Sequence, residues 1–487
     1  MNTFEGQRRQ APVEPQRTLR LRVTARLEER GSYPTWVLVA TLTGVFATSF
    51  PITILTISLS SMAAEFGARE TTMAWVVTGP VLLSAVALPL LGKLGDLYGH
   101  RRVFLTGFAA AAATAVAIAC AWSTASLITL RILAAVVGAA TQPTSMALLF
   151  SVYPPEHRSR AVGWWAMMGA AAPAAGLVAG GPLVQLFGWR IVFVLQACFS
   201  FAALALARLV LRETPTHGAR FDVAGSLSLA VGVAGLMFAL GESRTVGLES
   251  PLIWGSLVAG LLGIALFVWV ERRVRSPLLP LQYFRRPNFS APLLAGSFMG
   301  AAYMGAFVIA PIFLIQMFHY SIAATAGIML LRTLTLTAAS PLGGYLGARI
   351  GERGASMIGS AVVAVSLMVV ATGATHASLL IVCVGLVLQG LGNGVGGPPM
   401  TTAVAASVAH EHLGVAAAAS RLTSQVGVAF GITTLTMVYG GINTGAAFGR
   451  AFLVGAVLAG CAFLTSLRIG PRRAIDTGEV VFPRVEA

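Results

Sequence analysis

Long apolar runs alternate with short polar segments along almost the whole chain. Each run is about as long as a helix that crosses a bilayer, which needs about 20 residues. Helices are the expected structure, because an unpaired backbone amide costs several kcal/mol in lipid and a helix pairs its own amides. The runs predict fourteen membrane-spanning helices, near residues 36–58, 73–91, 103–122, 126–149, 161–183, 189–210, 223–240, 251–270, 290–316, 322–346, 356–374, 378–398, 414–438 and 450–467.

The amino-acid composition is that of a membrane protein. Of the 487 residues, 56% are hydrophobic and only 10% are charged. In an ordinary soluble domain about a quarter of the residues are charged. The composition therefore excludes a water-soluble globule of this length. We expect an all-α polytopic membrane protein whose surroundings are the lipid bilayer.

The 33 basic residues predict the topology. They give a net charge of +15, but they lie in short loops between apolar runs and not on one patch, so no nucleic-acid partner is expected. If the N-terminus is cytoplasmic, 26 of them lie on the cytoplasmic side, four on the opposite side and three inside spans. Basic loops stay on the cytoplasmic side. Both termini are therefore expected in the cytoplasm.

Cysteine and histidine give no sign of a metal or cofactor site. The four cysteines lie in apolar runs and have no CxxC or Cys/His spacing: Cys120, Cys198, Cys383 and Cys461. We therefore expect no metal, no cofactor and no disulfide framework. We also expect no enzyme, because the spans contain no cluster of Asp, His, Ser or Cys residues that could serve as a catalytic site.

One loop motif occurs twice in the chain. The segment from Gly92 to Arg102 recurs in weaker form from Gly344 to Gly354, at an offset of 252 residues. The same offset carries the start of the first span to the start of the ninth. We therefore expect two six-helix bundles with two inserted spans, an architecture of secondary transporters. The predicted divisions are a basic tail at 1–33, a bundle at 34–212, two extra spans with linkers at 213–288, a bundle at 289–468 and a tail at 469–487.

Two motifs resemble those of a known transporter family. The loop motif between the second and third spans comprises Gly92, Asp96, Gly99, Arg101 and Arg102. The fifth-span motif comprises Gly169, Pro173 and Gly176. Together they resemble the major facilitator superfamily, in particular its fourteen-span drug:proton antiporter branch of EmrB/QacA-type exporters. The resemblance implies the major facilitator fold, the bacterial plasma membrane and export of amphipathic small molecules.

Three positions depart from the pattern of that branch. Pro51 stands where the first span commonly has an Asp, and Ala134 takes the usual place of a Gln in the fourth span. Ser424 replaces an Arg of the thirteenth span, while Arg421 lies one turn earlier. These changes affect the usual proton coupling of the branch. Both a proton-coupled transporter and one with weak or no proton coupling therefore remain open.

The loop motif has residues suited to a gate. Its glycines permit close helix approach and a tight turn. Asp96 can pair with Arg101, Arg102 or Arg158, or sit at a helix N-terminus, and such a contact can hold one conformation until transport breaks it. The alternative is a basic loop that only sets the topology.

The fifth-span motif has residues suited to a hinge. Gly169 and Gly176 let helices approach closely, and Pro173 removes a backbone hydrogen bond and allows a local kink. The functional interpretation is a hinge or seal between the two halves. The alternative is close helix packing without any hinge.

Three arginines lie inside predicted spans, where charged residues by default mark a pathway. Arg131 and Arg421 lie near the ends of their spans, so each can either snorkel to the interface or face the pathway. Arg332 lies deepest, about 15 Å from the end at 1.5 Å per residue. We expect it to face the central pathway and to favour substrates with an anionic or strongly polar head group.

Amide side chains and the distribution of acids complete the predicted pathway. Gln142, Asn393 and Gln425 can either bind substrate or tie one helix to another. All 18 acidic residues fall outside the span centres. The pathway is therefore expected to contain cations without carboxylates, and arginine does not lose its charge near neutral pH.

Two transport functions follow from these features. The first is a secondary active exporter of amphipathic small molecules, of the multidrug-efflux type, that works by alternating access with protons as the coupling partner. The alternative is an exporter or flippase of lipids or lipid-like amphipaths with weak or no proton coupling. We expect a monomer in either case.

Overall fold

The computed structural model describes residues 19–73, 75–214, 222–247, 249–274, 281–409, 412–442 and 444–470. Most of the predicted tails, and parts of the predicted linkers, lie outside the described residues. Regular structure in the described part is helical. The elements are α1 (Leu19–Glu29), α2 (Tyr33–Ser49), α3 (Pro51–Phe66), α4 (Glu70–Met73), α5 (Trp75–Tyr98), α6 (His100–Ala119), α7 (Thr124–Ala139), α8 (Thr141–Val152), α9 (Pro155–Phe187), α10 (Arg190–Val210), α11 (Val223–Val246), α12 (Pro251–Glu271), the 3-10 helix η1 (Leu281–Arg285), α13 (Pro287–Phe318), α14 (Ile322–Thr375), α15 (Leu379–Ala406), α16 (Leu413–Tyr439) and α17 (Gly445–Ser466).

The helices confirm a multi-pass, all-helical membrane protein. Within the described ranges, ten helices are long and apolar enough to cross a membrane, or eleven if the bent helix α5 counts as one span. The predicted total of fourteen differs from this count and stays a prediction. Two features account for half of the difference from ten: two predicted spans share one element, and one predicted span is divided. The predicted spans in the bent helix α5 and in α9 account for the other half.

The two predicted spans that share one element lie in α14, and the divided span lies at Pro51. Element α14 covers 54 residues but contains two helices that meet at a kink at Gly351, whose φ of 83° and ψ of 157° are not helical. Glycine adopts such a positive φ without steric cost. The first predicted span is instead divided into α2 and α3 after Phe50, because Pro51 has no N–H to donate to the preceding turn.

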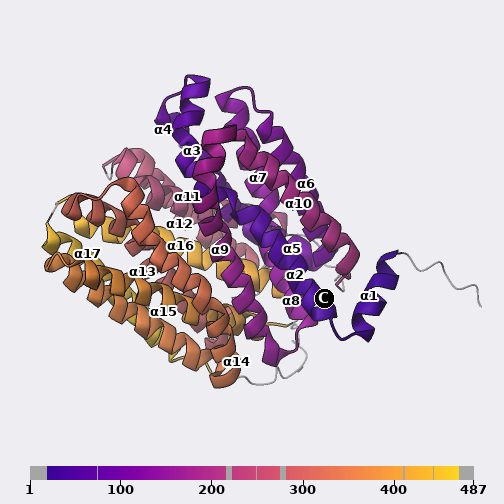
Figure 1. The fold of residues 1–487 in the computed structure, drawn as a ribbon. Helices are drawn as coiled ribbons and strands as arrows, with labels where there is room; N and C mark the ends of the chain where they lie inside the picture. The colour runs from indigo at the N-terminus through magenta and orange to yellow at the C-terminus, as the bar shows by residue number, and fades with distance from the viewer. Residues whose placement is uncertain are drawn as a thin grey trace, which may run out of the picture.

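Two groups of helices diverge from one shared end (Figure 1). The N-half comprises α2 to α10, and the C-half comprises α13 to α17. At the far ends of the two groups, α4 and α17 lie well apart in this view. At the shared end, α9 of the N-half packs against α14 of the C-half, and α5 packs against α16.

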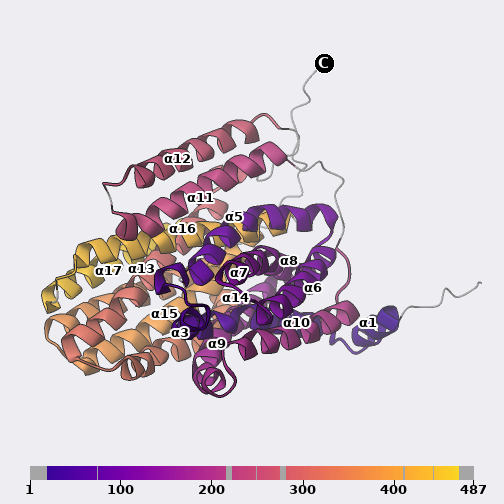
Figure 2. The same cartoon turned by 90° about the horizontal axis from the view of Figure 1, so that it is seen from above.

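Helices α11 and α12 form a pair outside both halves (Figure 2). The two backbones pack closely, since a Cβ atom at Gly235 would lie 2.7 Å from the backbone nitrogen of Gly260. Apolar side chains of the pair pack against Val86 of α5 and Leu422 of α16. The pair therefore covers the side on which α5 and α16 meet.

Each half has its own apolar core, and a third cluster joins them. Phe104 and Phe108 lie in the core of the N-half, and Phe313 lies in that of the C-half. The joining cluster packs Phe150 of α8 with Leu413 of α16, among other residues of both halves. Relative to exposure to water, burial of each such side chain contributes about 1.5–3 kcal/mol. The shared end is therefore closed by apolar packing as well as by polar contacts.

Candidate functional site

The carboxylate of Asp96 joins the two halves. Asp96 lies near the end of α5 and is 6% exposed. The backbone N–H groups of Gly414 and Val415 donate hydrogen bonds to its Oδ1 and Oδ2, at 3.1 and 3.2 Å. These amides belong to the first turn of α16, where N–H groups lack helical partners and the helix dipole favours a negative charge. Of the predicted contacts of Asp96, the structure thus shows the helix N-terminus.

His100 completes this contact, although sequence reasoning did not single it out. Its Nε2 lies 3.2 Å from Asp96 Oδ1, and the residue is 6% exposed. The two residues are four apart across the turn at Gly99. Side chains four apart lie close on a helical turn, so this spacing is the signal that could have identified the pair. We call Asp96, His100, Gly414 and Val415 the interhalf contact.

Small residues allow this contact to form. A Cβ atom at Gly92 would lie 2.8 Å from the carbonyl oxygen of Gly414 and 2.9 Å from Cβ of Ala418. Such separations are too short for a real side chain, so Gly92 lets the backbones of α5 and α16 meet. At Gly99 the φ of 97° reverses the chain between α5 and α6, a conformation that favours glycine.

The arginines of the loop motif face a different partner. Arg102 Nε lies 3.6 Å from Glu213 Oε2, and the backbone N–H of Arg101 donates to Glu213 Oε1 at 3.1 Å. Glu213 follows α10 and was not among the predicted residues. These contacts hold the loop against the N-half, while Asp96 reaches across to the C-half.

The second copy of the motif makes a matching contact between α14 and α9. A Cβ atom at Gly344, the first residue of this copy, would collide with the carbonyl oxygen of Ser159, and one at Gly163 would lie 2.7 Å from the carbonyl oxygen of Ser340, so the two helices touch through their backbones. Nearby, the guanidinium of Arg160 lies 5.1 Å from the centre of the Tyr345 ring. The two copies of the motif therefore both lie where the N-half and the C-half meet.

The predicted hinge lies in α9, a 33-residue helix with Pro173 and Pro182 in its interior. Open space surrounds Gly169, where an added Cβ atom would meet nothing within 4 Å among the described atoms. Beside the motif, Ala172 packs against Phe50 in the N-half. Helix α9 thus runs from the contact with α14 into the N-half, and its middle is locally loosely packed.

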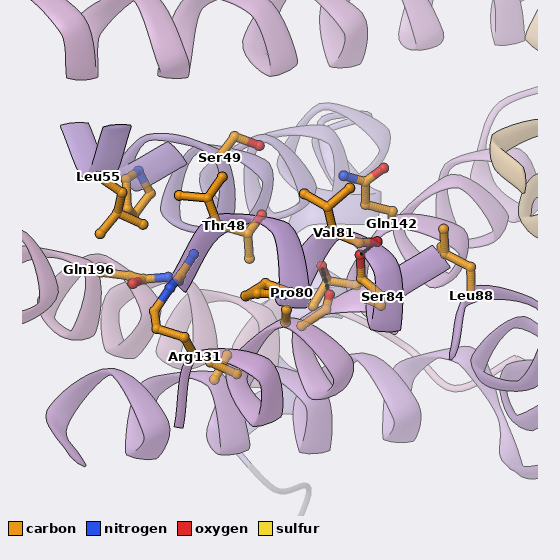
Figure 3. A pocket seen from close by; sticks show the side chains of 18 of the residues that line it. Thr48, Ser49, Leu55, Pro80, Val81, Ser84, Leu88, Arg131, Gln142 and Gln196 are labelled. Carbon is orange, nitrogen blue, oxygen red and sulfur yellow. Dashed lines mark hydrogen bonds between the residues drawn. The ribbon is translucent and has the colours of Figure 1, made fainter. Parts of the chain in front are cut away.

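A cavity of ≈ 200 Å³ lies between the halves (Figure 3). Most of its lining comes from the N-half, and α16 supplies the rest. The lining residues are Thr48, Ser49, Pro51, Leu55, Val77, Pro80, Val81, Ser84, Leu88, Ala111, Arg131, Ala134, Ala135, Gly138, Ala139, Thr141, Gln142, Gln196, Arg421 and Gln425.

Four predicted pathway residues line this cavity: Arg131, Gln142, Arg421 and Gln425. Gln196 was not among the predicted pathway residues, yet it also lines the cavity and is 8% exposed. Among the described lining residues there is no Asp, Glu or His. The lining is therefore largely apolar and also presents two positive charges, three amides and four hydroxyl groups.

Arg332 lies away from this cavity, and the expectation that it faces the pathway stays a prediction. It is 1% exposed and is not among the residues that line the cavity. Its Nη2 donates to the carbonyl oxygen of Tyr303 at 3.1 Å, and its guanidinium lies 3.5 Å and 4.5 Å from the ring centres of Tyr303 and Phe307. Aromatic faces attract a cation strongly when water is excluded. In the structure, the contacts of this buried charge are therefore with α13.

Asn393 also lies away from the cavity lining. It is half-buried on α15. Its neighbours in sequence, Gly392 and Gly394, pack closely against Gly359 and Ala339 of α14. The residue thus belongs to a close contact between two helices of the C-half.

Similar sequences are proteins of drug resistance and export. A protein of Streptomyces glaucescens, "Tetracenomycin C resistance and export protein", is 30% identical over 401 residues, which cover 82% of this chain and 74% of that protein. The "Multidrug transporter protein MdtP" of Bacillus subtilis is 27% identical over 413 residues, covering 84% and 76%. The "Methylenomycin A resistance protein" of the same species is 28% identical over 434 residues, covering 86% and 90%.

Solved structures share the fold. The human organic anion transporter MFSD10 matches with a TM-score of 0.63 at 17% identity, covering 89% of this chain and 98% of that one. The proton:xylose symporter XylE matches with a TM-score of 0.66 at 12% identity, covering 91% and 97%. At such identities the likeness concerns the fold alone.

A family model decides the classification. The model described as Major Facilitator Superfamily matches residues 41–431. The relatives and the structural neighbours are named as transporters, export proteins and resistance proteins, and not as enzymes. The chain belongs to the Major Facilitator Superfamily of membrane transporters.

Proposed function

We propose that the chain is a secondary active exporter of amphipathic small molecules in the bacterial plasma membrane, of the fourteen-span drug:proton antiporter branch. Its relatives are named for drug resistance and export. The observation that carries the mechanism is the contact of Asp96 with the first turn of α16. This contact closes one end of the molecule beside a cavity that both halves line.

The proposed topology has fourteen spans. It treats α2 with α3 as one span, α7 with α8 as one span, and the parts of α14 before and after Gly351 as two. Two six-helix bundles and the inserted pair α11 and α12 account for all of them. The 26-to-4 bias of basic residues supports a cytoplasmic location for both termini and for the interhalf contact.

Reporter fusions test this topology. A reporter at the C-terminus and one inserted after Glu249 should report opposite sides of the membrane. The same side for both would overturn the arrangement. A fusion within residues 275–280 should agree with the C-terminal one.

Alternating access follows from the interhalf contact. In this conformation the cytoplasmic end is closed by Asp96 at α16, by the backbone approach of Gly163 to Ser340 and by the apolar cluster that joins the halves. Opening toward the cytoplasm requires all three to separate. Because a packed interface has discrete arrangements, the halves switch between closed and open states.

Helix α9 is the proposed hinge. It carries the contact with α14 at one end and packs into the N-half near Ala172. Pro173 lacks an N–H for the preceding turn, and the open space beside Gly169 leaves room for a change of curvature. Bending there would let the cytoplasmic end of α9 move with the C-half.

The substrate pathway passes through the cavity, with Arg131, Gln142, Arg421 and Gln425 as substrate contacts. A proton carrier must gain and lose charge near neutral pH, and neither arginine nor glutamine does so. The lining therefore favours weak or no proton coupling within this function. Export of a lipid-like amphipath is the form of the function in which such coupling is least needed.

Reconstituted transport tests the proposed function. Purified full-length protein in liposomes should move a fluorescent amphipathic dye faster than protein-free liposomes do, and the rate should saturate with dye concentration. An imposed pH gradient separates the two coupling modes, since it accelerates only a proton-coupled exporter. If no anionic, neutral or cationic amphipath is moved by folded protein, the exporter function is wrong.

A further inference from the structure

The cavity offers two positive charges from opposite halves of the molecule. Arg131 comes from α7 of the N-half and Arg421 from α16 of the C-half. Resting on the exporter function proposed above, we propose that this cavity binds an organic anion, so that the substrates are amphipathic molecules with a negatively charged head group. The membrane potential then acts on the substrate's own charge.

The protein supplies no carboxylate that could neutralise these arginines in the cavity. Residues 97–155, 157–212 and 412–475 contain no Asp or Glu, and they include all the lining residues of α6, α7, α8, α10 and α16. The remaining lining residues lie between 48 and 88, and none of them is acidic. Arg421 is exposed, whereas Arg131 is half-buried, and a half-buried positive charge in an apolar site without a counterion is unfavourable. A bound anion supplies the missing counterion.

Arg131 differs from Arg332 in lining the cavity and in its contacts. Nη2 of Arg332 donates to a carbonyl oxygen and its guanidinium lies over two aromatic rings, while its Nε and Nη1 have no hydrogen-bond partner among the described residues. Arg131 lies 5.7 Å from the centre of one ring, that of Phe193, and its Nε likewise has no hydrogen-bond partner in the described part of the chain. Figure 3 shows the side chains of Arg131 and Gln196 pointing toward one another in the cavity. A guanidinium and an amide together present several N–H donors to a carboxylate or sulfonate.

The size of the cavity matches a head group. Sites for whole drug-sized ligands have about 300–1,000 Å³. This cavity has ≈ 200 Å³, so it encloses only part of an amphipath. Leu55, Val77, Val81 and Leu88 form apolar wall beside the polar groups. The anionic group is therefore expected at the arginines, with the apolar part of the molecule against these side chains.

The membrane potential can drive the export of a negatively charged substrate. The inside-negative membrane potential favours outward movement of one negative charge by about fiftyfold at 100 mV, which corresponds to about 2.3 kcal/mol. A neutral molecule gains nothing from the potential. Export of an anion therefore needs no proton carrier in the cavity.

Matched probes test the charge preference in liposomes that contain the full-length protein. Three dansyl probes share one alkyl chain and end in a sulfonate, a hydroxyl or a trimethylammonium group. A dansyl-labelled phosphatidylglycerol separates a lipid head group from a soluble anion. Potassium gradients with valinomycin set the membrane potential, and separate samples carry a pH gradient alone.

We expect the sulfonate probe to bind at least about tenfold more tightly than the ammonium probe, a difference of about 1.4 kcal/mol. Its movement should follow the potential and ignore the pH gradient. Movement of the phosphatidylglycerol alone would assign the same anion site to a lipid. Equal or better transport of the hydroxyl or ammonium probe would overturn the anion proposal and leave the exporter function standing. Movement of no probe would overturn both.

Variants locate the effect in the cavity. Arg131→Gln and Arg421→Gln should each weaken sulfonate binding by about tenfold and leave binding of the hydroxyl probe nearly unchanged, which also shows that the variants fold. Arg131→Lys keeps the charge and should keep most of the sulfonate binding. Arg450→Gln is the matched control, since this arginine is exposed on α17 and does not line the cavity. Sulfonate binding of wild-type strength in both cavity variants would contradict the proposal.

Discussion

The interhalf contact and the cavity use charge in opposite ways. At the interhalf contact, Asp96 is buried and has partners from both halves, namely His100 and the first amides of α16. In the cavity, Arg131 and Arg421 also come from both halves, but neither has an acidic partner among the described residues. A satisfied charge stabilises the conformation in which it is satisfied. An unsatisfied one favours a ligand.

This difference separates two roles that a transporter needs. Residues of the interhalf contact should set how often the end that they close opens, and residues of the cavity should set what is carried. Substitutions at the contact should therefore change transport rates more than substrate binding. Substitutions in the cavity should change the preference among substrates.

The largest effect is expected for Gly92→Val. The new side chain would meet the carbonyl of Gly414 and Cβ of Ala418, and overpacking of this kind costs up to about 3 kcal/mol. Transport should fall by roughly a hundredfold. Gly255→Val is the matched control, because an added Cβ there meets nothing within 4 Å. A rate for Gly92→Val equal to that of Gly255→Val would show that α5 and α16 need not meet.

Asp96→Asn should have the next largest effect. The change removes the negative charge from the first turn of α16, and hydrogen bonds to charged groups contribute about 2 kcal/mol. The transport rate should fall by roughly thirtyfold while substrate binding stays within about twofold.

Asp222→Asn is the control for that variant. Asp222 also caps a helix, accepting from the backbone N–H of Gly225 at 2.8 Å, but both residues belong to α11 and its N-cap. Its loss should lower stability without slowing the cycle comparably. If Asp96→Asn abolishes binding while its remaining turnover is normal, Asp96 does not act as a gate.

Arg332→Gln tests an arginine that does not line the cavity. Loss of the contacts with Tyr303 and Phe307 should lower the free energy of unfolding by about 1–2 kcal/mol. The melting temperature in detergent should drop, while the order of preference among the sulfonate, hydroxyl and ammonium probes stays the same. A selective loss of sulfonate transport would indicate that Arg332 faces the substrate pathway.

The smallest effect is expected for Glu213→Gln. Its ion pair with Arg102 is solvent-exposed on the arginine side, and such pairs contribute less than about 1 kcal/mol. Transport should change by less than about fivefold, and less still at high salt. A loss as large as that of Asp96→Asn would mean that the whole loop, and not the carboxylate of Asp96 alone, forms the gate.

The helical membrane fold could be predicted from the sequence because apolar run length and the cost of unpaired amides leave little choice. Family membership could be predicted because motif glycines and Asp96 have fixed spacing. Counting spans was harder, since two helices meet at Gly351 without a loop between them and Pro51 divides another span. The apolar runs separate the two helices of α14 but do not register the division at Pro51.

The candidate site could be predicted only in part. Depth along a span identified Arg131, Arg332 and Arg421 as unusual but gave no information on which direction each one faces. Rotation about the helix axis places Arg332 against Tyr303, and this depends on tertiary packing. The partner of Asp96 is more than 300 residues away in sequence, so spacing alone could not choose between a helix N-terminus and an arginine.

Distances between two spin labels, one on each half beside the interhalf contact, test most directly whether the contact of Asp96 holds the halves together. Spin labels would replace Tyr98 on α5 and Ile350 on α14, which are 57% and 48% exposed, in a protein whose four native cysteines are substituted. Asp96→Asn should shift the distance distribution toward longer values, and Asp222→Asn should leave it unchanged. An identical distribution with and without the Asp96 carboxylate would show that this carboxylate does not hold the halves together.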